Sequence, residues 1–166
     1  VGGDGDFDRE MAREILFKRV VPGPEYAEFC TQPDIKGFFE WFYGGEVHLH
    51  KRKLIRHARV EDTWTTPAHY DLVYLREGTE HLLSAWIPLG AVPVERGGLL
   101  YLEGSHKVYE EIDRAEGRQL RAQYISYDLP MLAERWNTRW LVANYEPGDM
   151  VVHSPYIVHA STDNVD

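Results

Sequence analysis

The sequence contains a single cysteine, Cys30, among its 166 residues. A disulfide within the chain needs two cysteines, so none can form, and metal sites built only from thiolates are excluded. This composition favours a reducing compartment, and we expect a cytoplasmic protein.

Long apolar runs and an excess of positive charge are also missing. No stretch approaches the roughly 18 to 20 apolar residues that span a bilayer, and no charged and then apolar leader opens the chain. Lysine and arginine number 18 against 27 aspartate and glutamate, which gives a formal net charge of −9. Such a chain is poorly suited to phosphate backbones and anionic membranes. We therefore expect neither nucleic acid nor a membrane as a partner, and we favour a small-molecule substrate.

The length and a hydrophobic content of 43% suit one domain that covers residues 1–166. The sequence begins without methionine and stops shortly after an informative segment. For this reason we expect the domain to be incomplete at both ends. The sequence does not indicate an oligomeric state.

Apolar spacing predicts helices over residues 8–20 and 33–45, the second bounded by a proline and a pair of glycines. From residue 46 onward, short runs rich in Val, Leu, Tyr and Trp predict strands, interrupted by a charged, partly helical segment at 107–136. The expected strands lie within 46–60, 69–75, 81–92, 98–102, 139–146, 148–154 and 156–161. This order predicts a mainly β fold, a double-stranded β-helix (jelly roll, cupin-like) with flanking helices.

The segment HYDLVYL carries His69 and Asp71 in a predicted strand. Residues separated by one position point to the same face of a strand, so both side chains could reach one ion. A half-buried carboxylate is costly without a cation or hydrogen-bond donors. A metal is one solution, and an ordinary salt bridge or turn hydrogen bond is the other. Tyr70, between the two residues, is expected to face away.

A third ligand is best supplied by His159, which follows His69 by 90 positions in another apolar segment, with His153 as the alternative. Two histidines and one carboxylate from non-adjacent strands form the facial triad of non-haem iron(II) proteins, which leaves open positions for other ligands. The histidines of VHLHKRKLIRH lie among basic residues, and we expect solvated or hydrogen-bonding roles for them.

Three segments follow one another between about Thr66 and Asn164: HYDLVYL, SAWIPLGAVPVERGGLLYLEGSHK and GDMVVHSPYIVHASTDN. In this order they resemble the HxD strand, the tryptophan strand with its Gly-Gly turn and GSH element, and the closing strand pair of one family. That family is the phytanoyl-CoA dioxygenase family of iron(II) and 2-oxoglutarate-dependent oxygenases. The closing pair includes a distal histidine and a serine two positions later.

The resemblance implies that His69, Asp71 and His159 are the iron ligands. It also implies candidates for the side chains that line the pocket of the cosubstrate 2-oxoglutarate: Ser161, Tyr74, Trp86 and Ser84. Tyr74 and Trp86 could instead be core aromatics, and Ser84 could be a small residue where two strands approach each other. The implied cofactors are Fe(II), 2-oxoglutarate and O2, and the implied reaction hydroxylates a small-molecule metabolite, with succinate and carbon dioxide as co-products. Related halogenases carry Gly or Ala at the position of Asp71, so the carboxylate favours hydroxylation.

One element of the family's pattern is not in the sequence. The family supplies an arginine roughly ten positions after the distal histidine, where a guanidinium can bind the far carboxylate of 2-oxoglutarate. Here the sequence stops at Asp166, seven positions after His159. We expect this arginine just beyond Asp166, or a different mode of cosubstrate binding.

Two other functions stay open at this point. A desaturase or cyclising oxygenase would use the same fold, iron and cosubstrate. A cupin-like module that binds a metal or a sugar would lack oxygenase activity. The acidic composition favours a modest-sized metabolite over a coenzyme A thioester as substrate.

Overall fold

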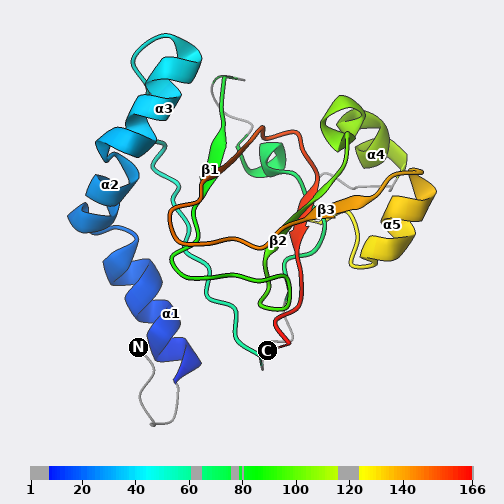
Figure 1. Ribbon diagram of the computed structural model, residues 1–166, viewed down its shortest axis with the longest axis horizontal. Helices are drawn as coiled ribbons and strands as arrows, with labels where there is room; N and C mark the ends of the chain where they lie inside the picture. Colours follow the sequence, from blue (N-terminus) through cyan, green and yellow to red (C-terminus); the bar gives the residue numbers. More distant parts are fainter. Residues whose placement is uncertain (1–7, 61–64, 76–78, 80, 116–123, 166) are drawn as a thin grey trace. The chain divides into compact units, whose positions relative to one another are not determined.

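The computed structural model describes residues 8–60, 65–75, 79, 81–115 and 124–165. The chain forms two compact units, Val1–His57 and Ala58–Asp166, and each is described by itself (Figure 1). The expectation of a single domain therefore stays a prediction. In the described ranges, no helix combines the length and the apolar character that crossing a membrane requires.

The first unit is helical. Its elements are α1 (Arg9–Ile15), the π-helical η1 (Leu16–Val20), α2 (Pro24–Cys30) and α3 (Pro33–Tyr43). The Asp8 side chain caps α1 by accepting a hydrogen bond from the Met11 N–H at 2.9 Å. Pro24 and Pro33 begin α2 and α3, where a missing N–H costs nothing, and Gly44 ends α3 with a φ of 69°. Both predicted helices are confirmed.

The strand predicted for residues 46–60 is wrong, because these residues form no strand in the structure. Residues that favour strands adopt them only where a neighbouring strand completes the hydrogen-bond ladder. Here side chains bond the backbone instead. The Arg52 N–H donates to His50 Nδ1 at 3.1 Å, and the Tyr26 hydroxyl donates to the Leu54 carbonyl at 2.8 Å.

The second unit contains the strands. Its elements are η2 (Asp71–Tyr74), β1 (Ser84–Trp86), β2 (Leu99–Leu102), η3 (Ser105–Lys107), α4 (Tyr109–Ala115), α5 (Leu129–Arg135), β3 (Trp140–Val142), β4 (Val151–His153) and β5 (His159–Ser161). The described strands form two antiparallel sheets, one of β1 and β4 and one in the order β3-β2-β5. Each predicted strand segment after residue 80 contains one of these strands. The predicted combination of antiparallel sheets and helices is confirmed at this level.

The register of the two sheets pairs polar residues. Ser84 lies opposite His153 in the β1–β4 pair, and Tyr101 lies opposite His159 in the β2–β5 pair. Directly opposite residues of an antiparallel pair project from the same face. Each sheet therefore has one face that presents a pair of polar side chains.

The other face of β2 and β5 carries the hydrophobic core. The buried cluster consists of Ala68, Tyr70, Leu102, Ile112, Leu132 and Val158. Ile112 belongs to α4 and Leu132 to α5, so these two helices cover this face (Figure 1). The Trp140 indole N–H donates to the Leu129 carbonyl at 2.7 Å and ties β3 to α5. Both helices fall within the helical segment predicted between the strands, of which residues 116–123 lie outside the described residues.

The segment HYDLVYL forms only the beginning of the predicted strand. Ala68 and His69 make isolated β-bridges, after which Asp71–Tyr74 turns into the 3-10 helix η2. The strand prediction for the second half of this segment is wrong, because the Leu75 N–H donates back to the Leu72 carbonyl at 3.1 Å and closes a turn.

Tyr70 retains an extended backbone, with φ −128° and ψ 148°. One extended residue is enough to place the side chains before and after it on the same side. The side chain of Tyr70 itself is 1% exposed and belongs to the core cluster. The expectation that Tyr70 faces away from His69 and Asp71 is confirmed.

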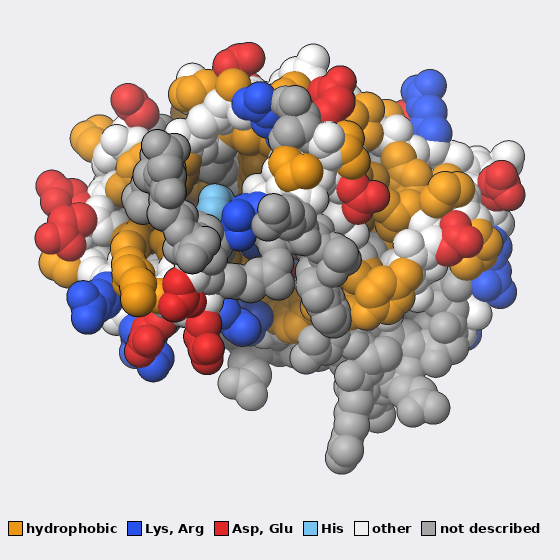
Figure 2. All heavy atoms as spheres, turned by 90° about the horizontal axis from the view of Figure 1, so that it is seen from below, with side chains coloured by type: hydrophobic (Ala, Val, Ile, Leu, Met, Phe, Trp, Pro, Cys, Tyr) orange, Lys and Arg blue, Asp and Glu red, His pale blue; other side chains and the backbone are white. Residues whose placement is uncertain are grey.

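Charges of both signs share the surface. On the face drawn in Figure 2, acidic and basic side chains lie in several separate places, with hydrophobic side chains between them.

Candidate metal centre

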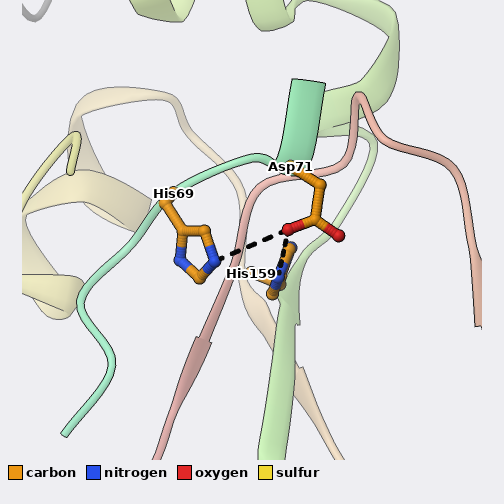
Figure 3. A group of neighbouring side chains, drawn as sticks. All are labelled: His69, Asp71 and His159. Carbon is orange, nitrogen blue, oxygen red and sulfur yellow. Dashed lines mark ion pairs between the residues drawn. The ribbon is translucent and has the colours of Figure 1, made fainter. Parts of the chain in front are cut away.

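Three side chains of the second unit point their donor atoms at one another (Figure 3). His69 Nε2 lies 3.8 Å and His159 Nε2 lies 3.7 Å from Asp71 Oδ1. Among the described residues, these three form a group whose ligand atoms are all within 4.8 Å of one another. The structure thus brings together the three residues that the sequence selected as metal ligands.

The two histidines are joined through their backbones. The His69 N–H donates to the His159 carbonyl at 3.0 Å, and the His159 N–H donates to the His69 carbonyl at 2.8 Å. This reciprocal bridge sets the imidazole ring centroids 4.2 Å apart. The main chain therefore holds the two residues side by side independently of any ion.

Both rings have the same local hydrogen bond. His69 Nδ1 lies 2.9 Å from the Pro67 carbonyl, and His159 Nδ1 lies 3.0 Å from the Ile157 carbonyl. A carbonyl oxygen only accepts hydrogen bonds, so in each neutral ring the proton is on Nδ1. In that tautomer the Nε2 atom carries the lone pair that a metal ligand requires, and it is directed toward the other two residues of the group (Figure 3).

The charges of the group also suit a cation. Burial, with a contribution from His69, lowers the pKa of His159 from 6.5 to about 3, so this ring is neutral near pH 7. Burial alone would raise the pKa of the Asp71 carboxyl. The hydrogen bond from His153, the His159 ring and the hydrogen bond from Ser84 outweigh that effect, and the pKa lies below its ordinary value of 3.8.

Two imidazoles and one carboxylate form the donor set of the two-histidine, one-carboxylate triad that binds non-haem iron(II). Both histidines are 6% exposed, so the donors lie in a largely dry environment. The residues present therefore fit an iron(II) ion.

The four residues predicted to line the cosubstrate pocket have different surroundings. The Ser84 hydroxyl donates to Asp71 Oδ2 at 2.8 Å, so it contacts a ligand residue directly. The Tyr74 ring centroid lies 6.1 Å from that of His69. The Trp86 ring packs on Tyr145 with centroids 4.7 Å apart.

Ser161 is bonded to the segment that precedes His69. Its hydroxyl oxygen accepts a hydrogen bond from the Thr66 N–H at 2.8 Å, and its own N–H donates to the Thr66 carbonyl at 3.0 Å. The hydroxyl proton of Ser161 is not used in these bonds. Because Ser161 and His159 are two positions apart in β5, their side chains leave the same face of the strand.

Two residues complete the group, and sequence reasoning missed their roles. His153 Nε2 lies 3.3 Å from Asp71 Oδ2, and the Tyr101 hydroxyl lies 2.7 Å from His153 Nδ1. From the sequence, His153 is expected only as an alternative ligand, and no role is expected for Tyr101. The sequence signal for each residue is the alternation of side-chain direction along its strand, which places His153 of β4 and Tyr101 of β2 on polar faces. No local sequence pattern indicates that these two strands bring their polar faces together.

Comparison with known proteins gives a consistent result. The family profile of phytanoyl-CoA dioxygenase (PhyH) matches residues 16–165. The 1-deoxypentalenic acid 11-beta-hydroxylases of Streptomyces exfoliatus and Streptomyces arenae are 28% and 26% identical, over 85% and 84% of this chain and 51% of each relative. The chain thus spans about half the length of these curated relatives.

Solved structures resemble the fold. The non-haem alpha-ketoglutarate-dependent carbocyclase SnoK from nogalamycin biosynthesis aligns with a TM-score of 0.56 and 23% identity, over 86% of this chain and 55% of SnoK. The epimerase SnoN, solved with Fe3+, alpha-ketoglutarate and nogalamycin RO, aligns with a TM-score of 0.58 and 22% identity, over 87% of this chain and 54% of SnoN. With nearly the whole chain matched by one family profile, the chain belongs to the phytanoyl-CoA dioxygenase family.

Proposed function

We propose that this chain carries the active site of an iron(II) and 2-oxoglutarate-dependent dioxygenase that hydroxylates a small-molecule metabolite. The observation that carries the proposal is the convergence of His69 Nε2, Asp71 Oδ1 and His159 Nε2 within 4.8 Å. The Nδ1 protons of both rings are bonded to carbonyl oxygens, which leaves both Nε2 lone pairs for the ion.

In this proposal His69, Asp71 and His159 would hold iron(II), and a triad of this kind leaves coordination positions for other ligands. When bound, iron and 2-oxoglutarate supply the oxidation, in which oxygen is consumed, succinate and carbon dioxide are released and a substrate carbon receives a hydroxyl group. The protein residues fix the ion, exclude water and orient the target C–H bond. The reciprocal backbone bridge between the histidines supports such a preorganised site.

Ser161 is the proposed protein contact for the cosubstrate. Its hydroxyl oxygen is held by the Thr66 N–H at 2.8 Å, and its proton can be donated to a carboxylate. Tyr74 and Trp86 are proposed as walls of the same pocket. For Ser84 we propose a different role, since its hydroxyl donates to Asp71 Oδ2.

We also propose how the two sheets are arranged around the site. The polar face of the β1–β4 pair carries His153, and that of the β3-β2-β5 sheet carries Tyr101 and His159. The 2.7 Å contact between Tyr101 and His153 joins these two faces. Two sheets that face each other across a site are what a double-stranded β-helix requires, and we propose that arrangement here.

The substrate class rests on the relatives. The Streptomyces relatives are named for 1-deoxypentalenic acid, and SnoN was solved with nogalamycin RO. Both names support a modest-sized metabolite as the substrate of this chain. The carbocyclase SnoK shares the fold, so a cyclising reaction with the same cofactors is the second candidate.

The test is an anaerobic titration of the metal-free protein with Fe(II) and 2-oxoglutarate, followed by exposure to oxygen and measurement of succinate. We expect binding of both, and succinate formation that depends on iron. Binding of iron without any succinate, with and without candidate substrates, would overturn the oxygenase and favour a cupin-like binding module. Product analysis by mass spectrometry separates hydroxylation, which adds one oxygen atom, from cyclisation or desaturation, which removes two hydrogen atoms.

A further inference from the structure

The two oxygens of the Asp71 carboxylate have different partners. Oδ1 faces the Nε2 atoms of His69 and His159, at 3.8 and 3.7 Å. Oδ2 faces away from them, accepts a hydrogen bond from the Ser84 hydroxyl at 2.8 Å and lies 3.3 Å from His153 Nε2. Oδ1 is thus directed at the proposed metal position, and Oδ2 is hydrogen-bonded to other side chains of the protein.

The contact with Asp71 indicates which nitrogen of His153 carries the proton, and the contact with Tyr101 is compatible with it. A carboxylate oxygen only accepts, so a lone pair on His153 Nε2 would repel Asp71 Oδ2, whereas an Nε2 proton is donated to it. In the tautomer with the proton on Nε2, Nδ1 is an acceptor, and the Tyr101 hydroxyl donates to it at 2.7 Å. Burial raises the pKa of Tyr101, which keeps that hydroxyl protonated.

His153 is therefore the opposite tautomer of its two neighbours. His69 and His159 have the proton on Nδ1, bonded to the carbonyls of Pro67 and Ile157. Their Nε2 atoms can bind a metal, whereas Nε2 of His153 is a hydrogen-bond donor. This difference separates His153 from the ligand set even though its ring centroid lies 4.8 Å from that of His159.

We propose that Ser84 and His153 form a clamp on Asp71 Oδ2 that limits Asp71 to one metal bond, and that Tyr101 fixes His153 in the donating tautomer. All three are positioning residues, and the inference rests on the proposed iron site. A carboxylate with both oxygens available can bind a cation through both of them. A second bond from Asp71 would occupy a position that the cosubstrate and oxygen need.

The fold explains why two donors reach the same oxygen. Ser84 and His153 are directly opposite each other in the β1–β4 pair, so their side chains leave the same face side by side. Tyr101 comes from β2 of the other sheet, where it lies opposite His159. The clamp consequently joins both sheets to the η2 segment that begins with Asp71.

The first test uses Mn(II) as the probe and counts its bound water molecules from the broadening of the manganese signal by oxygen-17 water. The variants are Ser84→Ala combined with His153→Leu, which removes both donors, and Ser84→Thr and His153→Gln, which keep a hydroxyl and an N–H donor. We expect the donor-free variant to bind one water fewer than the wild type. Its manganese form should bind 2-oxoglutarate about 10- to 100-fold more weakly, a loss of the size that removing an outer partner of a metal ligand causes in metal affinity or activity.

The controls distinguish a failure of the clamp from a folding defect and from a failure of the proposed function. Ser105→Ala removes another buried hydroxyl, which accepts from the Val158 N–H at 2.9 Å, and is expected to keep the wild-type water count and cosubstrate affinity. Equal water counts and affinities in the wild type and the donor-free variant would overturn the clamp and leave the proposed function intact. A wild type that binds neither Mn(II) nor 2-oxoglutarate would instead overturn the proposed function.

The second test addresses Tyr101. The variant Tyr101→Phe is expected to weaken 2-oxoglutarate binding in the wild-type background. It should have no further effect in the His153→Gln background, because a glutamine amide has no tautomers for Tyr101 to select. In the unaltered metal-free protein, nitrogen-15 NMR should find the proton of His153 on Nε2 and those of His69 and His159 on Nδ1. A proton on Nδ1 of His153 would overturn the proposal without the need for any variant.

Discussion

His69 and His159 exchange both of their backbone hydrogen bonds, at 3.0 and 2.8 Å, although 90 positions of sequence separate them. The bridge is isolated, since neither neighbour of His69 continues it as a strand with β5. It involves only main-chain atoms, so replacing either side chain leaves the groups that form both hydrogen bonds in place. This separation of scaffold from ligand makes the site suitable for substitution experiments.

The substitutions His69→Ala and Asp71→Ala are expected to abolish metal binding while the protein stays folded, because the backbone bridge survives. We expect Mn(II) affinity to fall by more than about 100-fold, beyond the usual cost of losing an outer partner. Calorimetric titration measures the affinity, and circular dichroism checks the fold. The exposed His106 provides a matched control, since His106→Ala should bind as the wild type does. Wild-type affinity in both ligand variants would refute the assignment.

The stability of the metal-free protein should fall as the pH decreases from about 6.5 toward 3. Burial holds the pKa of His159 at about 3, whereas the unfolded chain has the ordinary value of 6.5. The unfolded state therefore binds a proton first, and the stabilisation present above pH 6.5 is lost as the pH falls through this window. Urea unfolding at several pH values measures the effect, and His159→Asn should show a shallower decline. Parallel curves for wild type and variant would contradict the prediction.

Ser161→Ala is expected to weaken 2-oxoglutarate binding more than Mn(II) binding. The same substitution leaves the Thr66 N–H without its 2.8 Å acceptor. A loss of about 1 kcal/mol in the free energy of unfolding is therefore expected as well. Ser161→Thr keeps the hydroxyl and should restore both properties. If the affinity for 2-oxoglutarate does not change in the alanine variant, Ser161 is not part of the cosubstrate site.

Ile112→Ala should destabilise the protein without altering the donor atoms of the site. Ile112 is 0% exposed and packs in the core cluster between α4 and the sheet. A cavity at such a position costs about 2 to 5 kcal/mol. Chemical denaturation measures this loss, and Mn(II) affinity under folding conditions should stay close to that of the wild type. A small loss of stability combined with a large loss of metal affinity would be the contrary result.

The triad could be predicted from the sequence because its geometry depends on very little. His69 and Asp71 share a face as long as Tyr70 is extended, and Tyr70 is extended even though the chain turns into η2 directly afterwards. The predicted strand through Leu75 is wrong, but the i, i+2 relationship on which the ligand prediction depended needs only that one residue. The position of His159 followed from the order of the family's motifs.

The hydrogen bonds around Asp71 could not be predicted in the same way. Whether His153 donates or accepts at Nε2 depends on the Tyr101 hydroxyl, which comes from the other sheet. Ser84 contacts Asp71 because it lies opposite His153, and that register is set by long-range strand pairing. The strand-like composition of residues 46–60 was misleading for a related reason, since it does not reveal whether a partner strand is present.

An ion held by His69 and His159 would also act as a cross-link. It would close a loop of 90 positions, and any ligand that binds only the folded chain adds to its stability in proportion to the logarithm of its concentration. The metal-free chain keeps the bridge but lacks this link, so it opens more readily and is a better substrate for proteases. Iron supply would then govern how long the protein persists in the cell as well as how fast it works.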